Sequence, residues 1–232
     1  MSELTRKELL IALIGAGDRP RLSGLDLTEL DLAEIDLRGA NLHNTKLSRA
    51  DLSRADLSEA VVSGAVLIET DLSRARLVHA NFTDADLTGA NLKEAVLTTA
   101  VLSGAKLANA KLMFAKISEA IANEAFMRGT NFNGANITFA KLSGCDMTEA
   151  NFNGADLSGA DLRNSDLRGA DLSYANLSGA DISHALIAGA NFTGANLRGI
   201  YYIDVDLNEA ILNGAIMPGG TRYGEEGVIT IR

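Results

Sequence analysis

Apolar residues recur at every fifth position of this chain from Leu22 to Met217, without a break in register. We refer to these positions, whose numbers end in 2 or 7, as centres. Of the 40 centres, 26 are Leu and 38 are aliphatic, Met or Phe, the exceptions being Ala122 and Tyr202. Two residues before the centre, 29 of 40 positions are Ala, and Asp or Asn usually lies between. The pattern predicts one regular array of short elements.

The spacing excludes a helix and a continuous strand. Five residues of α-helix turn through about 500°, so successive centres would lie roughly 140° apart. In a strand, an odd spacing would move the apolar side chain to the opposite face at every repeat. A short strand that carries Ala and Leu on one face, followed by a turn, satisfies the pattern. Gly is frequent at the second position after the centre, where it tolerates the positive φ of a type II turn.

Such units bury their apolar side only by stacking on one another, as in a solenoid. The pattern A-[DN]-L-x-x, seen cleanly in ADLSGADLRNSDLRGADLSYANL (155–177), resembles the pentapeptide-repeat family over about 85% of the chain. The resemblance implies an all-β solenoid, a right-handed quadrilateral parallel β-helix with four pentads per coil. About ten coils, each about 4.8 Å thick, would make a rod about 48 Å long.

We expect three parts: a capping helix and link (1–19), the β-helix (20–219) and a C-terminal tail (220–232). Thr5 and Glu8 predict a capping box, and Gly15 and Gly17 predict the end of a short N-terminal α-helix. The same stretch weakly resembles a secretory signal peptide, but its acidic residues and the lack of a strong cleavage site favour the capping helix.

The C-terminal end is expected to be covered. Apolar residues take positions that should face outward near the last coil, namely Tyr201, Ile203, Ile211 and Ile216. Residues 228–231 (VITI) predict a strand that folds over this coil, and the alternative is that a second molecule docks there. A homodimer through the C-terminal end is therefore one expectation.

Composition fits a uniform core. Aromatic residues make up 5% of the chain and Trp is absent. The single cysteine, Cys145, takes an Ala position, so we expect a small buried thiol and no internal disulfide. A cytoplasmic protein is expected, and no apolar run approaches the roughly 18 residues that a membrane span needs.

The sequence shows no candidate catalytic or metal site. The three histidines, His43, His79 and His184, occupy outward positions on separate coils, so no pair is placed to share a metal. The many Asp and Asn residues follow the repeat, which indicates a structural role. We therefore expect no enzymatic activity, no cofactor and no bound metal.

One region departs from the repeat. Lys106, Lys111 and Lys116 replace Asp or Asn in three consecutive pentads, so they should point from three sides of one layer. Nearby, Ala122 replaces a centre Leu, which would leave a gap costing about 2–5 kcal/mol unless it is filled. One alternative is that Phe126 turns inward to fill it. The other is a partner-binding belt of Lys106, Lys111, Phe114, Lys116, Phe126, Arg128 and Phe139.

Charge is uneven along the chain. Residues 142–219 carry ten acidic and three basic side chains, net −7, whereas residues 22–141 have a net charge of −3. An acidic face is expected from four consecutive pentads, at Asp156, Asp161, Asp166 and Asp171. The favoured function is a non-catalytic protein-binding scaffold with an unidentified protein partner and no direct nucleic-acid binding. The resemblance also includes DNA mimics, so the alternative is a mimic acting on a type II topoisomerase, by gyrase inhibition or protection.

Overall fold

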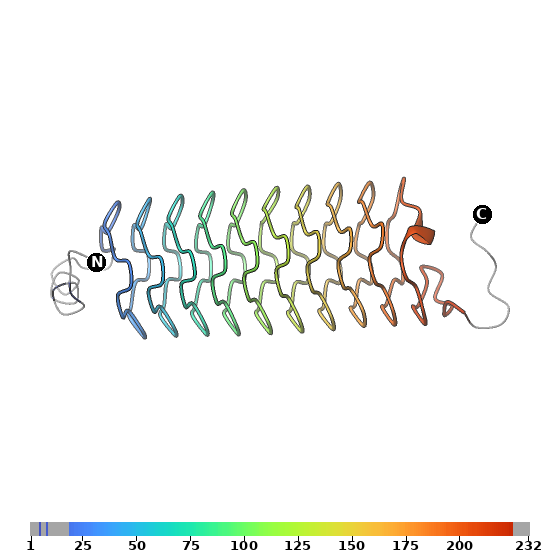
Figure 1. The fold of residues 1–232 in the computed structure, drawn as a ribbon, viewed down its shortest axis with the longest axis horizontal. Helices are drawn as coiled ribbons and strands as arrows, with labels where there is room; N and C mark the ends of the chain where they lie inside the picture. Colours follow the sequence, from blue (N-terminus) through green and yellow to red (C-terminus); the bar gives the residue numbers. More distant parts are fainter. Residues whose placement is uncertain (1–4, 6–7, 9–18, 225–232) are drawn as a thin grey trace.

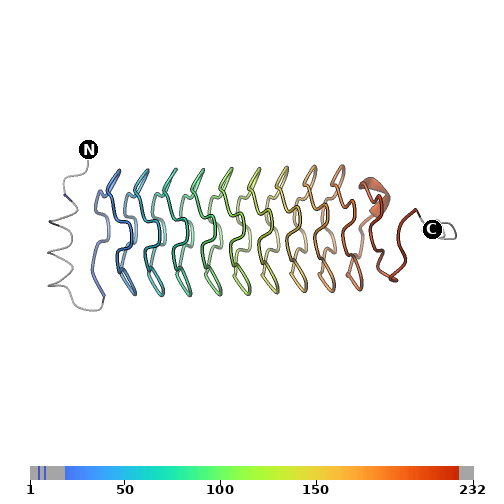
Figure 2. The same cartoon turned by 90° about the horizontal axis from the view of Figure 1, so that it is seen from below.

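The protein is a rod of stacked coils (Figures 1 and 2). The computed structural model describes Thr5, Glu8 and residues 19–224. In this part of the chain the backbone winds around one long axis, and residues 19 and 224 lie at opposite ends of the rod.

The register repeats once every four pentads. Parallel bridges join residues 20 positions apart along the rod, from Arg21 with Asn41 to Asn196 with Ile216. One circuit therefore contains four pentads, as the family resemblance implied. Each bridge involves one residue per coil, because the next turn follows at once. Between residues 19 and 224 the one regular helix is a 3₁₀ turn, η1 (Leu207–Glu209). The predicted all-β solenoid is confirmed in this part of the chain.

The circuit has four sides, which we name by their bridge residues. Face I carries every twentieth residue from 21, face II from 26, face III from 31 and face IV from 36. Corners lie between them: the turn residues of corner III/IV are 34, 54, 74 and so on to 214, and those of corner IV/I are 39, 59, 79 and so on to 219. Residues on one face or corner are neighbours when they are four pentads apart.

One pentad shows how the backbone groups are satisfied. The Asn91 N–H donates to the Thr70 carbonyl of the preceding coil (2.9 Å), and the Leu92 N–H donates to the Lys111 carbonyl of the next (2.7 Å). The Ala95 N–H closes the turn onto the Leu92 carbonyl (3.0 Å). The turn residue before each Ala position has a positive φ throughout residues 24–204, as predicted.

The repeated Asp and Asn side chains stabilise these turns. Their Oδ1 atoms accept a hydrogen bond from the backbone N–H two residues later, as Asp71 does from Ser73 (2.8 Å) and Asp156 from Ser158 (3.0 Å). The turn leaves this N–H group without a backbone acceptor, and the side-chain oxygen accepts its hydrogen bond in place of water. The template carboxylates therefore act first on the backbone.

Centres and Ala positions form one continuous core along the axis. Cys145 is buried as predicted, and its Sγ lies 2.8 Å from the Ala122 carbonyl oxygen, to which the thiol donates. Burial raises the pKa of this thiol to about 12, so it stays protonated at neutral pH.

The gap at Ala122 is not filled by Phe126. Phe126 is 54% exposed, so the expectation that its side chain turns inward is wrong. Ala122 lies two pentads from the buried Phe132, which places a small centre opposite a large one in the same circuit. The Phe132 ring stacks on Phe152 of the next coil, with ring centroids 4.8 Å apart. Phe126 is at a bridge position, from which its side chain points outward rather than into the core.

The N-terminal capping box is present. The Thr5 N–H donates to the Glu8 carboxylate (2.8 Å), and the Glu8 N–H donates to Thr5 Oγ1 (3.3 Å). The rest of the predicted capping helix lies outside the described residues, and so does the strand predicted at 228–231.

Candidate partner-binding surface

The predicted belt extends over three of the four faces of the rod. Lys106 and Phe126 are bridge partners on face II, and Arg128 follows at the next corner. On this side the cations are engaged: Lys106 Nζ lies 3.9 Å from an Asp86 oxygen, and Arg128 bonds Glu149 at 3.0 Å.

The remaining belt residues lie elsewhere on the circuit. Lys111 is on face III and Lys116 on face IV, with Phe114 at the corner between them, while Phe139 lies at corner IV/I. A single flat partner surface can contact only part of this set. The structure therefore divides the belt into a face II group and a group around face IV.

The expected acidic face does not form. Asp156, Asp161, Asp166 and Asp171 belong to four different bridge columns, so they point from faces IV, I, II and III. They make a ring around the rod, because neighbours on a face are four pentads apart rather than one. The expectation treated consecutive pentads as adjacent, which the four-sided circuit excludes.

Two of these four carboxylates are neutralised by their own pentad. Arg163 bonds Asp161 (2.8 and 2.6 Å), and Arg168 bonds Asp166 in the same way. Hydrogen bonds from the arginine side chain lower the pKa of each of these aspartates. Within the described residues, neither Asp156 nor Asp171 forms an ion pair, which sets these two aspartates apart from Asp161 and Asp166.

Three aromatic residues occupy turn positions with positive φ around face IV. Phe114 and Tyr174 lie at corner III/IV and Phe139 at corner IV/I, with φ values of 58°, 58° and 57°. They are 56%, 68% and 65% exposed, respectively. For an L-residue this backbone conformation costs roughly 1–2 kcal/mol, which Gly avoids and Asn largely avoids. Three bulky rings therefore stand where smaller residues would be more stable.

Each of these rings lies over a glycine of the next coil. A Cβ built on Gly134 would be 2.6 Å from the Phe114 ring, and one on Gly159 would be 2.5 Å from the Phe139 ring. Tyr174 covers Gly194 in the same way, at 2.8 Å. The Cδ1–Cε1 edge of each ring lies over the glycine, and more than half of each residue stays exposed to solvent. Side chains at 134, 159 or 194 would displace the rings.

We name this region the aromatic strip: face IV from Lys116 to Asn196 with the three rings at its corners. Its middle is a polar ladder, in which Asn196 Nδ2 donates to Asn176 Oδ1 and Asn176 Nδ2 to Asp156 Oδ1, both at 3.0 Å. Tyr174 was missed by the sequence reasoning. The sequence feature that identifies Tyr174 is Gly194, because each of the three exposed corner rings is followed by a glycine four pentads later.

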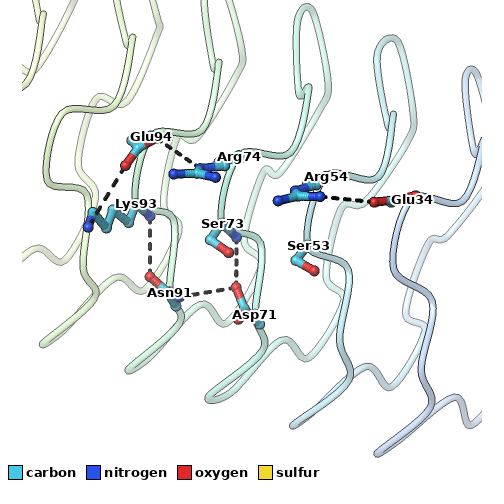
Figure 3. A pocket seen from close by; sticks show the side chains of 9 residues that line it. All are labelled: Glu34, Ser53, Arg54, Asp71, Ser73, Arg74, Asn91, Lys93 and Glu94. Carbon is cyan, nitrogen blue, oxygen red and sulfur yellow. Dashed lines mark hydrogen bonds and ion pairs between the residues drawn. The ribbon is translucent and has the colours of Figure 1, made fainter.

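The first half of corner III/IV is different. Its residues line a shallow hollow of about 330 Å³. In this hollow Arg54 pairs with Glu34 (3.1 Å) and Arg74 with Glu94 (2.9 Å) (Figure 3). Lys93 Nζ lies 3.8 Å from Glu94. Positive and negative groups balance here, so the surface satisfies its own charges.

The C-terminal end is partly covered by the chain itself. The Met217 N–H donates to the Thr221 carbonyl and the Tyr223 N–H to the Ala215 carbonyl, both at 2.7 Å, and Ile216 forms an antiparallel bridge with Arg222. These contacts close face IV of the last coil and cover Ile216, one of the four predicted patch residues.

The other sides of the last coil stay open within the described chain. The N–H groups of Leu212 and Gly214 would pair with a following coil, and neither forms a hydrogen bond with another described residue. Tyr201, Ile203 and Ile211 are exposed beside this edge. Three of the four predicted patch residues are therefore exposed at this end, and their role in docking stays a prediction.

The described residues hold no cluster of three or more His, Cys, Asp or Glu side chains placed for a metal ion. The histidines bond separately, His43 to Ser63, His79 to Thr99 and His184 to Asp204. Within the part of the chain that the structure covers, no helix has the length and apolarity of a membrane span.

Comparison with solved structures finds related rods. HetL, a pentapeptide repeat protein involved in heterocyst differentiation regulation in the cyanobacterium Nostoc sp. strain PCC 7120, is 32% identical with a TM-score of 0.74, covering 95% of this chain and 100% of HetL. QnrB1, a plasmid-mediated fluoroquinolone resistance protein, is 22% identical with a TM-score of 0.49, covering 80% of this chain and 90% of QnrB1. Rfr23 from the cyanobacterium Cyanothece 51142 is 33% identical with a TM-score of 0.31, covering 44% of this chain and 63% of Rfr23.

No curated protein matches the chain. The family profile described as pentapeptide repeats matches in eight copies, over residues 21–54, 45–84, 80–113, 110–148, 150–187 and 185–219. Together with the four-pentad circuit and the likeness to HetL, this match shows that the chain belongs to the pentapeptide-repeat family.

Proposed function

We propose that the protein is a non-catalytic scaffold that binds a protein partner through the aromatic strip. The observation that carries the proposal is the set of three exposed rings, Phe114, Phe139 and Tyr174, held at positive φ. A positive φ is shared by every turn residue between 24 and 204, so what sets these three apart is a large aromatic ring left exposed at a corner. Exposed aromatic side chains are also the residues that most often dominate binding energy in protein interfaces.

The rod suits this role because its surface is rigid. Along the strip, backbone hydrogen bonds to the neighbouring coils fix the corners, so little conformational entropy is lost when a partner docks. HetL, involved in heterocyst differentiation regulation, is similar over nearly the whole chain, which supports a regulatory setting for the scaffold.

DNA mimicry has weaker support. A mimic needs carboxylates that follow one another along the rod, whereas the acidic half stacks at most two aspartates in succession on any face among the described bridge positions. Arg163 and Arg168 neutralise two of them. The likeness to QnrB1 has a TM-score of 0.49 and carries no argument for this function.

The scaffold proposal is tested with a triple variant, F114N/F139N/Y174N. Asn already occupies turn positions with positive φ, as at Asn109 and Asn164, so the fold should be retained and the melting temperature should not fall. Partners captured from a native lysate would be identified by mass spectrometry, and the triple variant should lose them. The control is Phe126→Asn, which removes an exposed ring from face II. Equal capture by the triple variant and the unmodified protein would contradict the proposal.

We also propose that the open C-terminal end pairs with a second copy. The N–H groups of Leu212 and Gly214, which no described residue accepts, lie beside exposed Tyr201 and Ile211, and an uncovered strand edge of this kind favours association. Light scattering should give about twice the 24.4 kDa chain mass. The variant Y201N/I211N should give the single-chain mass, and one chain per particle in both proteins would refute pairing.

A further inference from the structure

The aromatic strip contains a carboxylate with no ionic partner among the described residues. Asp156 lies on face IV between two of the exposed rings. Gly159, which follows Asp156 at corner IV/I, lies beneath the Phe139 ring of the preceding coil. Tyr174 lies at corner III/IV in the coil that follows Asp156. Gly154 and Gly159 flank Asp156 at the two corners and place no side chain over it. Asp156 therefore lies between Asn136 and Asn176 on its face, with glycine at both flanking corners and an aromatic turn residue one coil away along each corner.

The contacts of Asp156 are all neutral. Its Oδ1 accepts from the Ser158 N–H and from Asn176 Nδ2, both at 3.0 Å. Among the described residues no Lys, Arg or His lies within ion-pair distance of it. Asp171, on the other side of corner III/IV, is bonded in the same way, to Ser173 and Asn191. Tyr174 thus stands between two uncompensated negative charges.

We infer that this part of the strip binds an arginine side chain from a basic segment of the partner protein. The inference rests on the proposed function, since it identifies the chemistry of the same surface. A guanidinium is planar, so it can stack on the Phe139 or Tyr174 ring while its N–H groups bond the Asp156 carboxylate. Lysine can use the carboxylate but lacks the flat group that matches the rings.

Charge over a longer range favours the same occupant. Residues 142–219 have a net charge of −7, and the whole chain has −9. This field attracts a basic segment and raises its rate of encounter. Nucleic acid, the other class of ligand that stacks on exposed rings, is a polyanion and is repelled by the same field.

The test uses the full chain labelled with ¹⁵N and a capped hexa-arginine peptide as the probe. Binding should shift the amide signals of Gly154, Gly159 and Gly194, which line the strip. Hexa-lysine of the same length should bind about threefold more weakly or worse, because it loses the stacking. A peptide of six citrullines, which are neutral and nearly the same shape as arginine, should give no shift.

Variants separate this site from general attraction to an acidic rod. Asp156→Asn should raise Kd for hexa-arginine about fivefold, as should the double change F139N/Y174N. The matched control is Asp71→Asn. Asp71 has the same two hydrogen bonds, to the Ser73 N–H and from Asn91 Nδ2, and lies among no aromatic rings. It should change Kd less than twofold. Asn is already present on face IV at 136 and 176, so Asp156→Asn should keep the fold.

The outcomes are distinct. Equal weakening by Asp156→Asn and Asp71→Asn, equal affinity for hexa-lysine, or no shift at the three glycines would each overturn the arginine site. If the F114N/F139N/Y174N variant loses its captured partner while Asp156→Asn keeps it at full affinity, the scaffold stands and the arginine site is wrong. If the triple variant keeps its partner, the proposed function itself is wrong.

Discussion

Corner III/IV has two halves with the same backbone and opposite surfaces. In the first half the turn residues are Glu34, Arg54, Arg74 and Glu94, which pair with one another along the rod (Figure 3). In the second half, from Phe114 onward, the turn residues are two aromatic rings and four glycines. The φ values of these non-glycine turn residues lie between 58° and 61° in both halves.

The difference teaches where specificity resides in such a rod. A turn side chain leans on the residue four pentads later, so each pair along a corner decides whether the surface is satisfied internally. A Glu followed by an Arg forms an ion pair, whereas a Phe followed by a Gly leaves the ring exposed to solvent. The charged side chains of the first half pair with one another, and the proposed partner would contact the exposed rings of the second half.

The largest expected loss of stability comes from a substitution in the core, which supports both halves of corner III/IV. Leu167 is fully buried, so Leu167→Asp would place an unpaired charge in the axis and should cost about 4 kcal/mol or more. Because coils contact only their neighbours, hydrogen exchange should show lost protection around residues 142–217 before residues 22–100. Leu167→Met is the control, expected to cost less than about 1.5 kcal/mol. An unchanged melting temperature in Leu167→Asp would contradict the inward placement of the centres.

The ring-on-glycine contact can be isolated by two alanine substitutions in the second half. Gly134→Ala and Gly154→Ala both add a Cβ at positive φ, 63° and 65°, which should cost about 1 kcal/mol. At Gly134 the new Cβ would also be 2.6 Å from the Phe114 ring, whereas nothing lies within 4 Å at Gly154. Gly134→Ala should therefore be the more destabilising by a further ~1 kcal/mol in chemical denaturation.

The additional Phe114→Asn substitution provides the cross-check. It should remove the extra cost of Gly134→Ala, because the clashing ring is gone. If the two alanine variants are equally stable, Phe114 does not rest on Gly134 in solution.

The ion pairs of the first half should contribute less. Arg54→Gln and Arg74→Gln each break an exposed pair, so each should lower the free energy of unfolding by under about 1 kcal/mol at low salt. The loss should shrink at about 0.5 M salt, where exposed charges are screened. Partner capture should be unaffected. A loss of capture comparable to that of the triple aromatic variant would show that the partner binds the first half of corner III/IV, which would contradict the proposed docking surface.

The smallest effect concerns pH. Arg168 lowers the pKa of Asp166, so this pair stabilises the fold at pH values above the unfolded pKa of about 3.9 and loses that contribution as the pH falls through the folded value. Asp166→Asn should be less stable than the unmodified protein by under about 1 kcal/mol at pH 7, and this difference should shrink as the pH falls below about 3.9. A difference that does not shrink in acid would show that the carboxylate charge is not the cause.

The core and register of the rod were accessible from the sequence because Leu at the centre and Ala two residues before it have a fixed place in every pentad. Cys145 and the positive φ at the corners followed from the same template. The count of four pentads per circuit came from the family resemblance, since a five-residue period alone is compatible with other polygons.

The surface was harder to predict, because its neighbours are four pentads apart in the chain. Asp156 and Asp161 look adjacent in the sequence, and the rod turns them to different faces. The alternative in which Phe126 fills the core considers side-chain volume alone, whereas a side chain at a bridge position points outward. In the sequence, Tyr174 looks like an ordinary variation at a turn position, because its contact with Gly194 joins residues that are four pentads apart.

The four-pentad circuit also has a consequence for how such chains can diverge. Duplication of a whole circuit would lengthen the rod and leave every downstream column in its alignment. Insertion of a single pentad would keep the core equally well packed but rotate everything beyond it by a quarter turn, moving Tyr174 out of line with Phe114. Two homologues with equally regular repeats can therefore display entirely different surfaces, and their pentads should be counted modulo four before any binding residue is transferred between them.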